Sequence, residues 1–99
     1  MRLQDWEVTA IKQAFLNYFA KGDQLWVFGS RVDDTLKGGD IDLYVETKMT
    51  DVSEILQKKR RFSIAIQDAI GEQKIDVVIE RPGYNLPIHQ EARKTGIQI

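Results

Sequence analysis

Two aspartates open the stretch 40–46, DIDLYVE, in which polar and apolar residues alternate. Alternate residues of a β-strand project from one face about 6.6 Å apart, so Asp40 and Asp42 can offer oxygens to one hard cation or a close pair of cations. An isolated Asp-x-Asp is a weak indication, because any half-exposed strand turns polar residues outward. A metal site therefore requires further residues.

A third acid, Asp76, opens the outward-facing side of a later alternating stretch, KIDVVIE at 74–80. If these two stretches are neighbouring strands, all three acids converge. At an effective dielectric constant of about 20, two carboxylates about 5 Å apart repel by roughly 3 kcal/mol, which a small domain would not accumulate without a cation. We therefore predict that Asp40, Asp42 and Asp76 bind Mg²⁺ or Mn²⁺. The open alternative is that Lys74 neutralises Asp76 in a surface ion pair.

A Gly-Ser turn, Gly29-Ser30, directly follows the apolar run 24–28. Glycine lets the backbone turn sharply and approach a ligand, and a helix begun at Ser30 would direct N–H groups and a hydroxyl at a phosphate. Arg31 is a further candidate for phosphate binding, and a solvent-facing arginine is the alternative. No Gly-Lys-Ser/Thr follows the glycine at the required distance, which excludes a Walker loop.

The periodicity of the chain predicts the elements that position these residues. Continuous apolar character over 24–28 is typical of a central strand, and alternation predicts the two later strands. The predicted elements, in chain order, are a helix over 5–20, strands over 24–28 and 40–46, a helix over 51–70 with Asp51 as cap and Gly71 beyond its end, a strand over 74–80, and a short helix from 85–87 to Lys94, followed by Gly96 and a tail. This order predicts an α/β (α+β) fold with a small mixed sheet and helices packed on one face.

Composition bounds the class of protein. Ninety-nine residues with 42% apolar content predict one domain over 1–99. The chain has 14 Lys and Arg against 15 Asp and Glu, so it lacks the excess of positive charge expected of a nucleic-acid-binding protein. The absence of cysteine excludes a disulfide scaffold, a thiolate zinc site and a cysteine nucleophile. No secretory or membrane-spanning stretch is recognisable, so we expect a soluble, cytoplasmic protein without a membrane partner.

The spacing Gly29-Ser30, nine residues, then Asp40-Ile41-Asp42, with a later Asp76, resembles the signature of the nucleotidyltransferase superfamily related to polymerase beta. At this length the chain most resembles the minimal nucleotidyltransferases. The resemblance implies the polymerase beta-like fold, phosphate binding at Gly29 and Ser30, and divalent metals at Asp40 and Asp42, with Asp76 completing the site. Small members commonly act as antitoxins beside a HEPN-domain toxin, which implies AMP transfer from ATP to a hydroxyl on that partner.

Two departures from the family pattern keep other functions open. Members usually carry a glycine soon after Gly-Ser and a serine before the first metal aspartate, whereas Val32, Asp33 and Asp34 occupy the first region and Gly39 the second. The extra negative charge of Asp33 and Asp34 would repel a triphosphate and weaken nucleotide binding. One alternative is therefore a binding module that neutralises its toxin by complex formation. A second is a transferase for a small molecule, which would need an added acceptor domain or a dimer. A homo- or hetero-oligomer is also open.

The remaining residues of interest have structural explanations. The four cations over 58–61 are expected on a solvated helix face. Trp26, in the predicted central strand, is expected in the core. His89 is the only histidine, and because the sequence indicates no partner for it, we assign it no catalytic role.

Overall fold

The computed structural model describes residues 1–32 and 39–99, and its elements lie within one or two residues of those predicted. A short 3₁₀ helix, η1, directly follows the first strand. In chain order the elements are α1 (Asp5–Tyr18), β1 (Gln24–Phe28), η1 (Gly29–Val32), β2 (Ile41–Glu46), α2 (Val52–Ile70), β3 (Ile75–Glu80), α3 (Pro87–Thr95) and β4 (Ile97–Gln98).

The four strands form one mixed sheet in the order β3-β2-β1-β4. β1 pairs antiparallel with both β2 and β4, so the prediction of a central strand over 24–28 is confirmed. β2 and β3 run parallel, because α2 crosses over between them. This parallel pairing places the beginnings of β2 and β3 side by side, next to the end of β1.

The C-terminal residues are not a free tail as expected, because they form β4 against β1. Gly96 permits this contact, since a Cβ there would lie 2.8 Å from the Val27 carbonyl oxygen and 3.1 Å from the Phe28 Cβ. The pairing continues past β4, where the Ile99 amide donates to the Leu25 carbonyl over 3.0 Å. A side chain at position 96 would therefore separate the end of α3 from the sheet.

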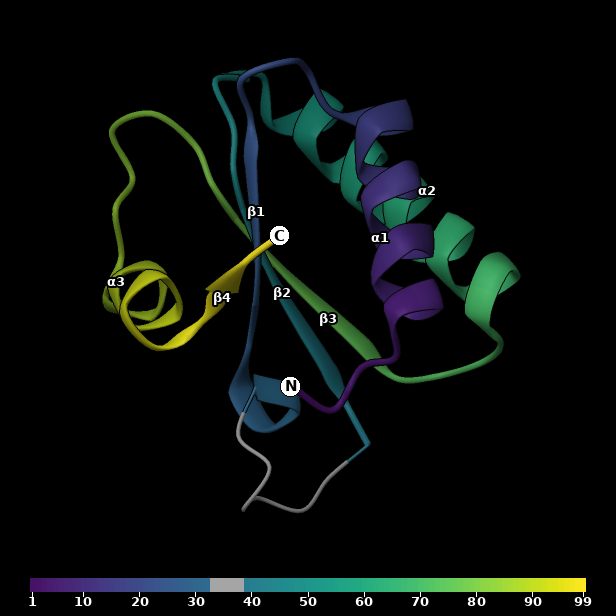
Figure 1. The fold of residues 1–99 in the computed structure, drawn as a ribbon. Helices are drawn as coiled ribbons and strands as arrows, with labels where there is room; N and C mark the ends of the chain where they lie inside the picture. Colours follow the sequence, from purple (N-terminus) through teal and green to yellow (C-terminus); the bar gives the residue numbers. More distant parts are fainter. Residues whose placement is uncertain (33–38) are drawn as a thin grey trace.

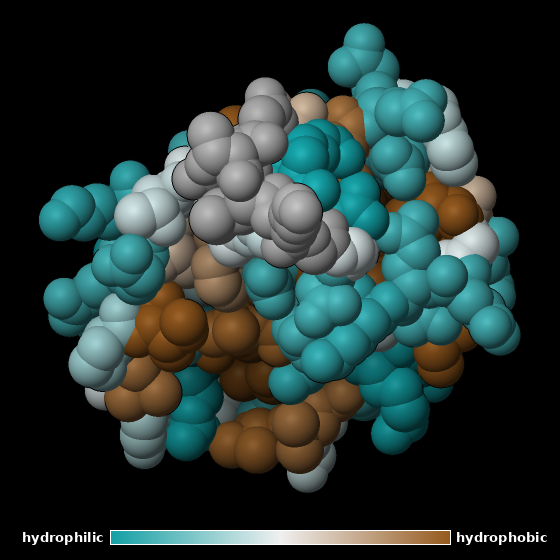
Figure 2. Space-filling model, turned by 90° about the horizontal axis from the view of Figure 1, so that it is seen from below, coloured by the Kyte–Doolittle hydropathy of each residue, from teal (hydrophilic) through white to brown (hydrophobic). Residues whose placement is uncertain are grey.

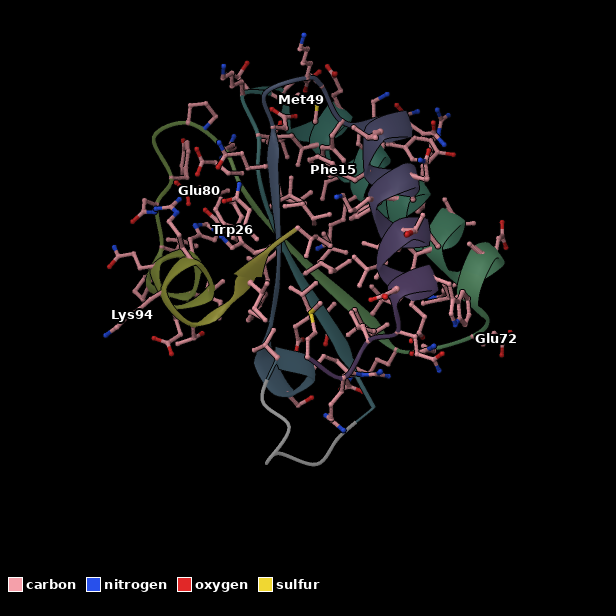
Figure 3. The ribbon with its side chains drawn as sticks, in the orientation of Figure 1. Phe15, Trp26, Met49, Glu72, Glu80 and Lys94 are labelled. Atoms are coloured by element: carbon pink, nitrogen blue, oxygen red, sulfur yellow. The ribbon has the colours of Figure 1, made fainter. Side chains whose placement is uncertain are left out.

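The helices cover both faces of the sheet, with α1 and α2 on one side and α3 on the other (Figure 1). The expectation of helices on one face holds for α1 and α2 but is wrong for α3. The larger core lies under α1 and α2, where Phe15 packs (Figure 3). The opposite face needs its own cover, because Trp26 and Tyr44 point there and pack against Ala92 of α3.

Local signals fix the ends of α2, the helix that connects β2 to β3. The side chain of Asp51 accepts a hydrogen bond from the Ser53 amide at its start, and Gly71, with φ of 93°, ends it. Phe62 and Ile66, spaced at one helical turn, are fully buried against the sheet. No helix within 1–32 or 39–99 has the length and apolar character needed to span a bilayer.

Candidate active site

The sheet brings the predicted site residues together at one end. Asp42 and Asp76 are direct partners in the parallel register of β2 and β3, and Asp42 also faces Phe28, the last residue of β1. Gly29 and Ser30 follow immediately in η1. The strand order therefore places the Gly-Ser turn, Asp42 and Asp76 at the same end of the sheet.

Asp42 lies where negative charge accumulates. The pKa of its carboxyl group is raised, first by burial and then by the negative charges of Asp76 and Asp40, while Lys74 partly opposes the shift. The described residues around Asp42 thus disfavour its charged carboxylate. A bound cation would favour the charged form and so lower the pKa of Asp42.

Gly29 is in van der Waals contact with the Asp42 carboxylate. Its φ of 76° lies in the left-handed region, and a Cβ added there would overlap the Asp42 carboxylate. Glycine is therefore required for both conformation and space. The turn is also fixed from outside, because the Arg2 guanidinium donates to the Ser30 carbonyl oxygen over 3.0 Å.

Asp40 lies just before β2 and makes an ion pair of its own. Its Oδ2 is 3.5 Å from the Lys74 Nζ, and both side chains are well exposed, at 48% and 70%. Lys74 thus pairs with Asp40, whereas the sequence suggested Asp76 as its partner. An exposed pair of this kind contributes only about 0–1 kcal/mol, so Asp40 can exchange Lys74 for another cation at little cost.

Arg31 is engaged with protein groups on three sides. Its guanidinium donates to the carbonyl oxygens of Arg2 (3.0 Å) and Gly39 (2.7 Å) and to Gln73 Oε1 (3.0 Å). These contacts tie η1 to the residue before Asp40 and to the turn that precedes β3. Arg31 thus positions the segments that carry the acids, and its binding of phosphate stays a prediction.

The donor set suits a hard divalent cation, because carboxylate oxygens are the ligands that Mg²⁺ and Mn²⁺ prefer. Within 1–32 and 39–99, however, no three His, Cys, Asp or Glu side chains are already arranged as a metal cage. Asp42 and Asp76 are in register, whereas Asp40 contacts Lys74. Binding of an ion by all three would therefore require Asp40 to turn.

The segment between the turn and Asp40 is only partly described. Val32, the last residue of η1, packs against the core, whereas Asp33 and Asp34 lie outside the described residues. Figure 2 views the molecule from this end and shows hydrophilic surface beside the grey atoms and a separate hydrophobic area on the same face.

The sequence analysis missed a polar cluster on the same face of β2 and β3. The Tyr44 hydroxyl donates to Glu80 over 2.6 Å, and Arg93 of α3 donates to Tyr44 (2.5 Å), Glu46 (2.9 Å) and Glu80 (3.1 Å). Trp26 and Glu80 both lie on the side of the sheet that α3 covers (Figure 3). The cluster fastens α3 to the sheet at the end of β2 and β3 opposite the aspartates.

His89 belongs to this cluster, so the expectation that it lacks a partner is wrong. It is 3% exposed, its Nδ1 accepts a hydrogen bond from the Leu86 amide, and its ring stacks on Tyr44 with centroids 5.7 Å apart. A sequence signal existed, because residues 89 and 93 are spaced four apart, as on one helical face.

Comparison with known families agrees with this geometry. Residues 8–97 match the family model described as "Nucleotidyltransferase domain", a span that contains every predicted site residue. A search of the curated proteins finds no match. The match covers most of the chain and accords with the small mixed sheet and its three helices. The chain belongs to the nucleotidyltransferase domain family.

Proposed function

We propose that this nucleotidyltransferase transfers AMP from ATP to a hydroxyl group on a HEPN-type toxin and so acts as its antitoxin, with Mg²⁺ or Mn²⁺ as cofactor. The observation that carries the transfer chemistry is the position of Asp42, which lies against Gly29 and in register with Asp76. The phosphate turn and the acids thus meet at one point. The choice of AMP and of a protein acceptor rests on the resemblance to the minimal nucleotidyltransferases.

Each site residue has a role in the proposed reaction. Gly29 and Ser30 hold the phosphates, and Asp40, Asp42 and Asp76 hold the divalent ions. Bound Mg²⁺ supplies Lewis-acid stabilisation of the triphosphate and of the leaving pyrophosphate. The acceptor oxygen bonds to the α-phosphorus, the bond from that phosphorus to the pyrophosphate oxygen breaks, and Asp76 receives the hydroxyl proton.

Labelling tests this proposal directly. The chain is incubated with Mg²⁺, ATP labelled at its α-phosphate and a purified HEPN-type toxin, and the label on the toxin is counted. We expect Asp42→Asn and Asp40→Asn to lose labelling. Asp68→Asn, at an exposed aspartate of α2 outside the site, is the matched control and should retain it. Labelling that persists in both site variants would overturn the proposal.

A binding module is the second candidate, and the Asp40 contact with Lys74 favours it, because that pair satisfies one acid without a metal. Such a module would neutralise the toxin by covering it. Calorimetry with Mg-ATP separates the two functions. Nucleotide affinity that disappears in Asp42→Asn supports the enzyme, whereas toxin neutralisation without any nucleotide affinity supports the module.

A further inference from the structure

β3 is an edge strand whose outer backbone groups have no partner within residues 1–32 and 39–99. Its Lys74 and Glu80 carbonyls accept hydrogen bonds from the amides of Ile41 and Thr47, so the even-numbered residues of β3 face β2. The N–H and C=O of one strand residue point to the same side, and those of residues 75, 77 and 79 therefore point away. None of the described residues pairs with them. An open edge of this kind is a template for another strand.

Apolar side chains gather beside this edge. Val52 and Leu56 of α2 and Tyr84 and Leu86 after β3 are each about half exposed. Together with Ile79 they line a cavity of about 260 Å³. Exposed apolar surface that adjoins an unpaired strand is typical of an interface with another chain.

We propose that two copies of this chain pair through β3, antiparallel and about a twofold axis at Val77, and so join their sheets. Odd-numbered residues must face one another, because only their backbone groups point outward, and this requires the axis to lie at a residue rather than between two residues. At Val77 the whole strand is paired, with Ile75 opposite Ile79 of the second copy. Three facing pairs then exchange two hydrogen bonds each.

The charges of β3 favour a second copy as the occupant. This register sets Lys74 opposite Glu80 of the other copy, twice by symmetry, and sets Asp76 opposite Val78, so no like charges face each other. Lys74 is free to turn, since its side chain is 70% exposed. Glu80 uses only Oε1 in its hydrogen bonds to Tyr44, Asn85 and Arg93, which leaves Oε2 for the incoming ammonium group.

Other registers of the same pairing fit less well. An axis at Ile79 would set Ile75 opposite Gly83, in the turn that follows β3. An axis at Asp76 or at Val78 would set like charges opposite each other, because Asp76 would face its own copy or Glu80. An axis at Ile75 would pair the end of β3 with Gly71, outside the strand. The register at Val77 pairs five of the six residues of β3 with one another and sets the sixth, Glu80, opposite Lys74, without facing like charges.

Sedimentation equilibrium with the full chain tests the proposal. We expect a reversible rise from the 11.4 kDa monomer to a dimer as concentration increases. Lys74→Glu alone and Glu80→Lys alone should each weaken the dimer about tenfold or more, because two attractive pairs become repulsive. A mixture of the two variants should restore it, since both cross-pairs are then opposite in charge. Lys12→Glu, at an exposed lysine of α1, is the matched control.

A second variant is needed to distinguish a lost interface from a disturbed fold, because Glu80→Lys also removes a hydrogen-bond acceptor of Arg93. Ile75→Pro deletes a free N–H at the first residue of an edge strand, and Ile75→Ala controls for the loss of a side chain that packs against the core. Ile75→Pro should give a monomer and Ile75→Ala a dimer, with matching circular dichroism spectra. A wild-type chain that stays monomeric, including one that binds only other proteins, would overturn the proposal. So would a dimer that neither Lys74→Glu nor Ile75→Pro weakens, or variants that remain monomeric when mixed.

Discussion

Strands β2 and β3 carry two pairs of facing acids on the same side of the sheet, four residues apart. Asp42 faces Asp76 at one end, and Glu46 faces Glu80 at the other. Arg93 donates to both glutamates, over 2.9 and 3.1 Å, so the chain itself supplies their counter-charge. The aspartates have no arginine of this kind among the described residues. The glutamate pair therefore holds α3 against the sheet, whereas the aspartate pair stays available to bind a cation from solution.

The pKa values of Asp42 and Glu80, one acid from each pair, shift in opposite directions. Burial alone would raise the pKa of Glu80, but hydrogen bonds from Tyr44 and Asn85 and the positive charge of Arg93 lower it overall. The pKa of Asp42 is raised by burial and by neighbouring carboxylates. The pKa values of these two acids on one face of the sheet thus differ in direction because Arg93 donates hydrogen bonds to the glutamate pair only, among the described residues.

The largest expected effect is on activity at the aspartate pair. Asp42→Asn should lower the rate of nucleotidyl transfer about 10³-fold, because metal stabilisation of the transition state amounts to several kcal/mol. Glu46→Gln is the matched control in the other pair and should leave the rate within a fewfold of wild type. The rate of pyrophosphate release measures both. An equal loss in Glu46→Gln would contradict the division of roles.

A smaller loss is expected at the glycine that adjoins Asp42. Gly29→Ala should reduce the transfer rate about tenfold or more, because its Cβ displaces the Asp42 carboxylate, and small misplacements of site groups are costly. Gly83→Ala measures the loss of stability that a side chain at positive φ causes without a clash, since Gly83 has φ of 84° and its added Cβ meets no atom within 4 Å beyond its chain neighbours. Retained activity in Gly29→Ala would show that this contact is dispensable.

At the glutamate pair the expected effect is on stability. Arg93→Met should lower the free energy of unfolding by about 1–3 kcal/mol, because hydrogen bonds to charged groups are lost. The lower part of that range is expected, since the Arg93 side chain is 41% exposed. Lys94→Met, at the exposed neighbouring position, should change the free energy by less than about 0.5 kcal/mol. Urea unfolding measures both free energies. Equal losses in the two variants would contradict a specific role of Arg93 in holding α3 against the sheet.

The smallest expected effect is the pH dependence of stability, with opposite signs at the two pairs. Because the pKa of Asp42 is raised on folding, its contribution is fully present below the ordinary value of 3.8 and is lost as pH rises through the folded pKa. Asp42→Asn should therefore raise the melting temperature at neutral pH, and this gain should vanish in acid. A lowered melting temperature at neutral pH would contradict the assigned direction.

For Glu80 the sign is reversed. Its pKa is lowered on folding, so its contribution is present above the ordinary value of 4.5 and is lost as pH falls through the folded pKa. Glu80→Gln should lower the melting temperature at neutral pH, and the deficit should shrink in acid. Thermal unfolding as a function of pH measures both variants, and curves of the same sign would contradict the comparison.

The elements of this fold other than β4 were predictable because their signals are local. Buried residues of α2 recur at helical spacing, and Asp51 and Gly71 mark its ends. The alternation in β2 predicted which residues face the larger core, although not that Tyr44 on the other face is buried. That burial depends on α3, and the hydrogen bond from Arg93 to Tyr44 joins residues 49 positions apart. Periodicity carries no information about such a contact.

The candidate site was predictable to a similar extent. Spacing placed Asp40 and Asp42 on one strand, and the later Asp76 was expected nearby only if the strands were neighbours. The strand order confirmed that condition. The partners of Arg31 and Lys74 were not predictable from the sequence. Both side chains are long and cationic, and the acceptors that they contact come within reach only in the folded chain.

The sequence by itself determined the types and spacing of the groups that bear the chemistry: a Gly-Ser turn, two aspartates two residues apart and a third on a later strand. The tertiary structure alone decided which acids the chain neutralises. Asp42–Asp76 and Glu46–Glu80 look alike along the sequence, but α3 brings Arg93 to only one of them. Electrostatic energy depends on distance in space and on burial, and both are set only when the elements pack.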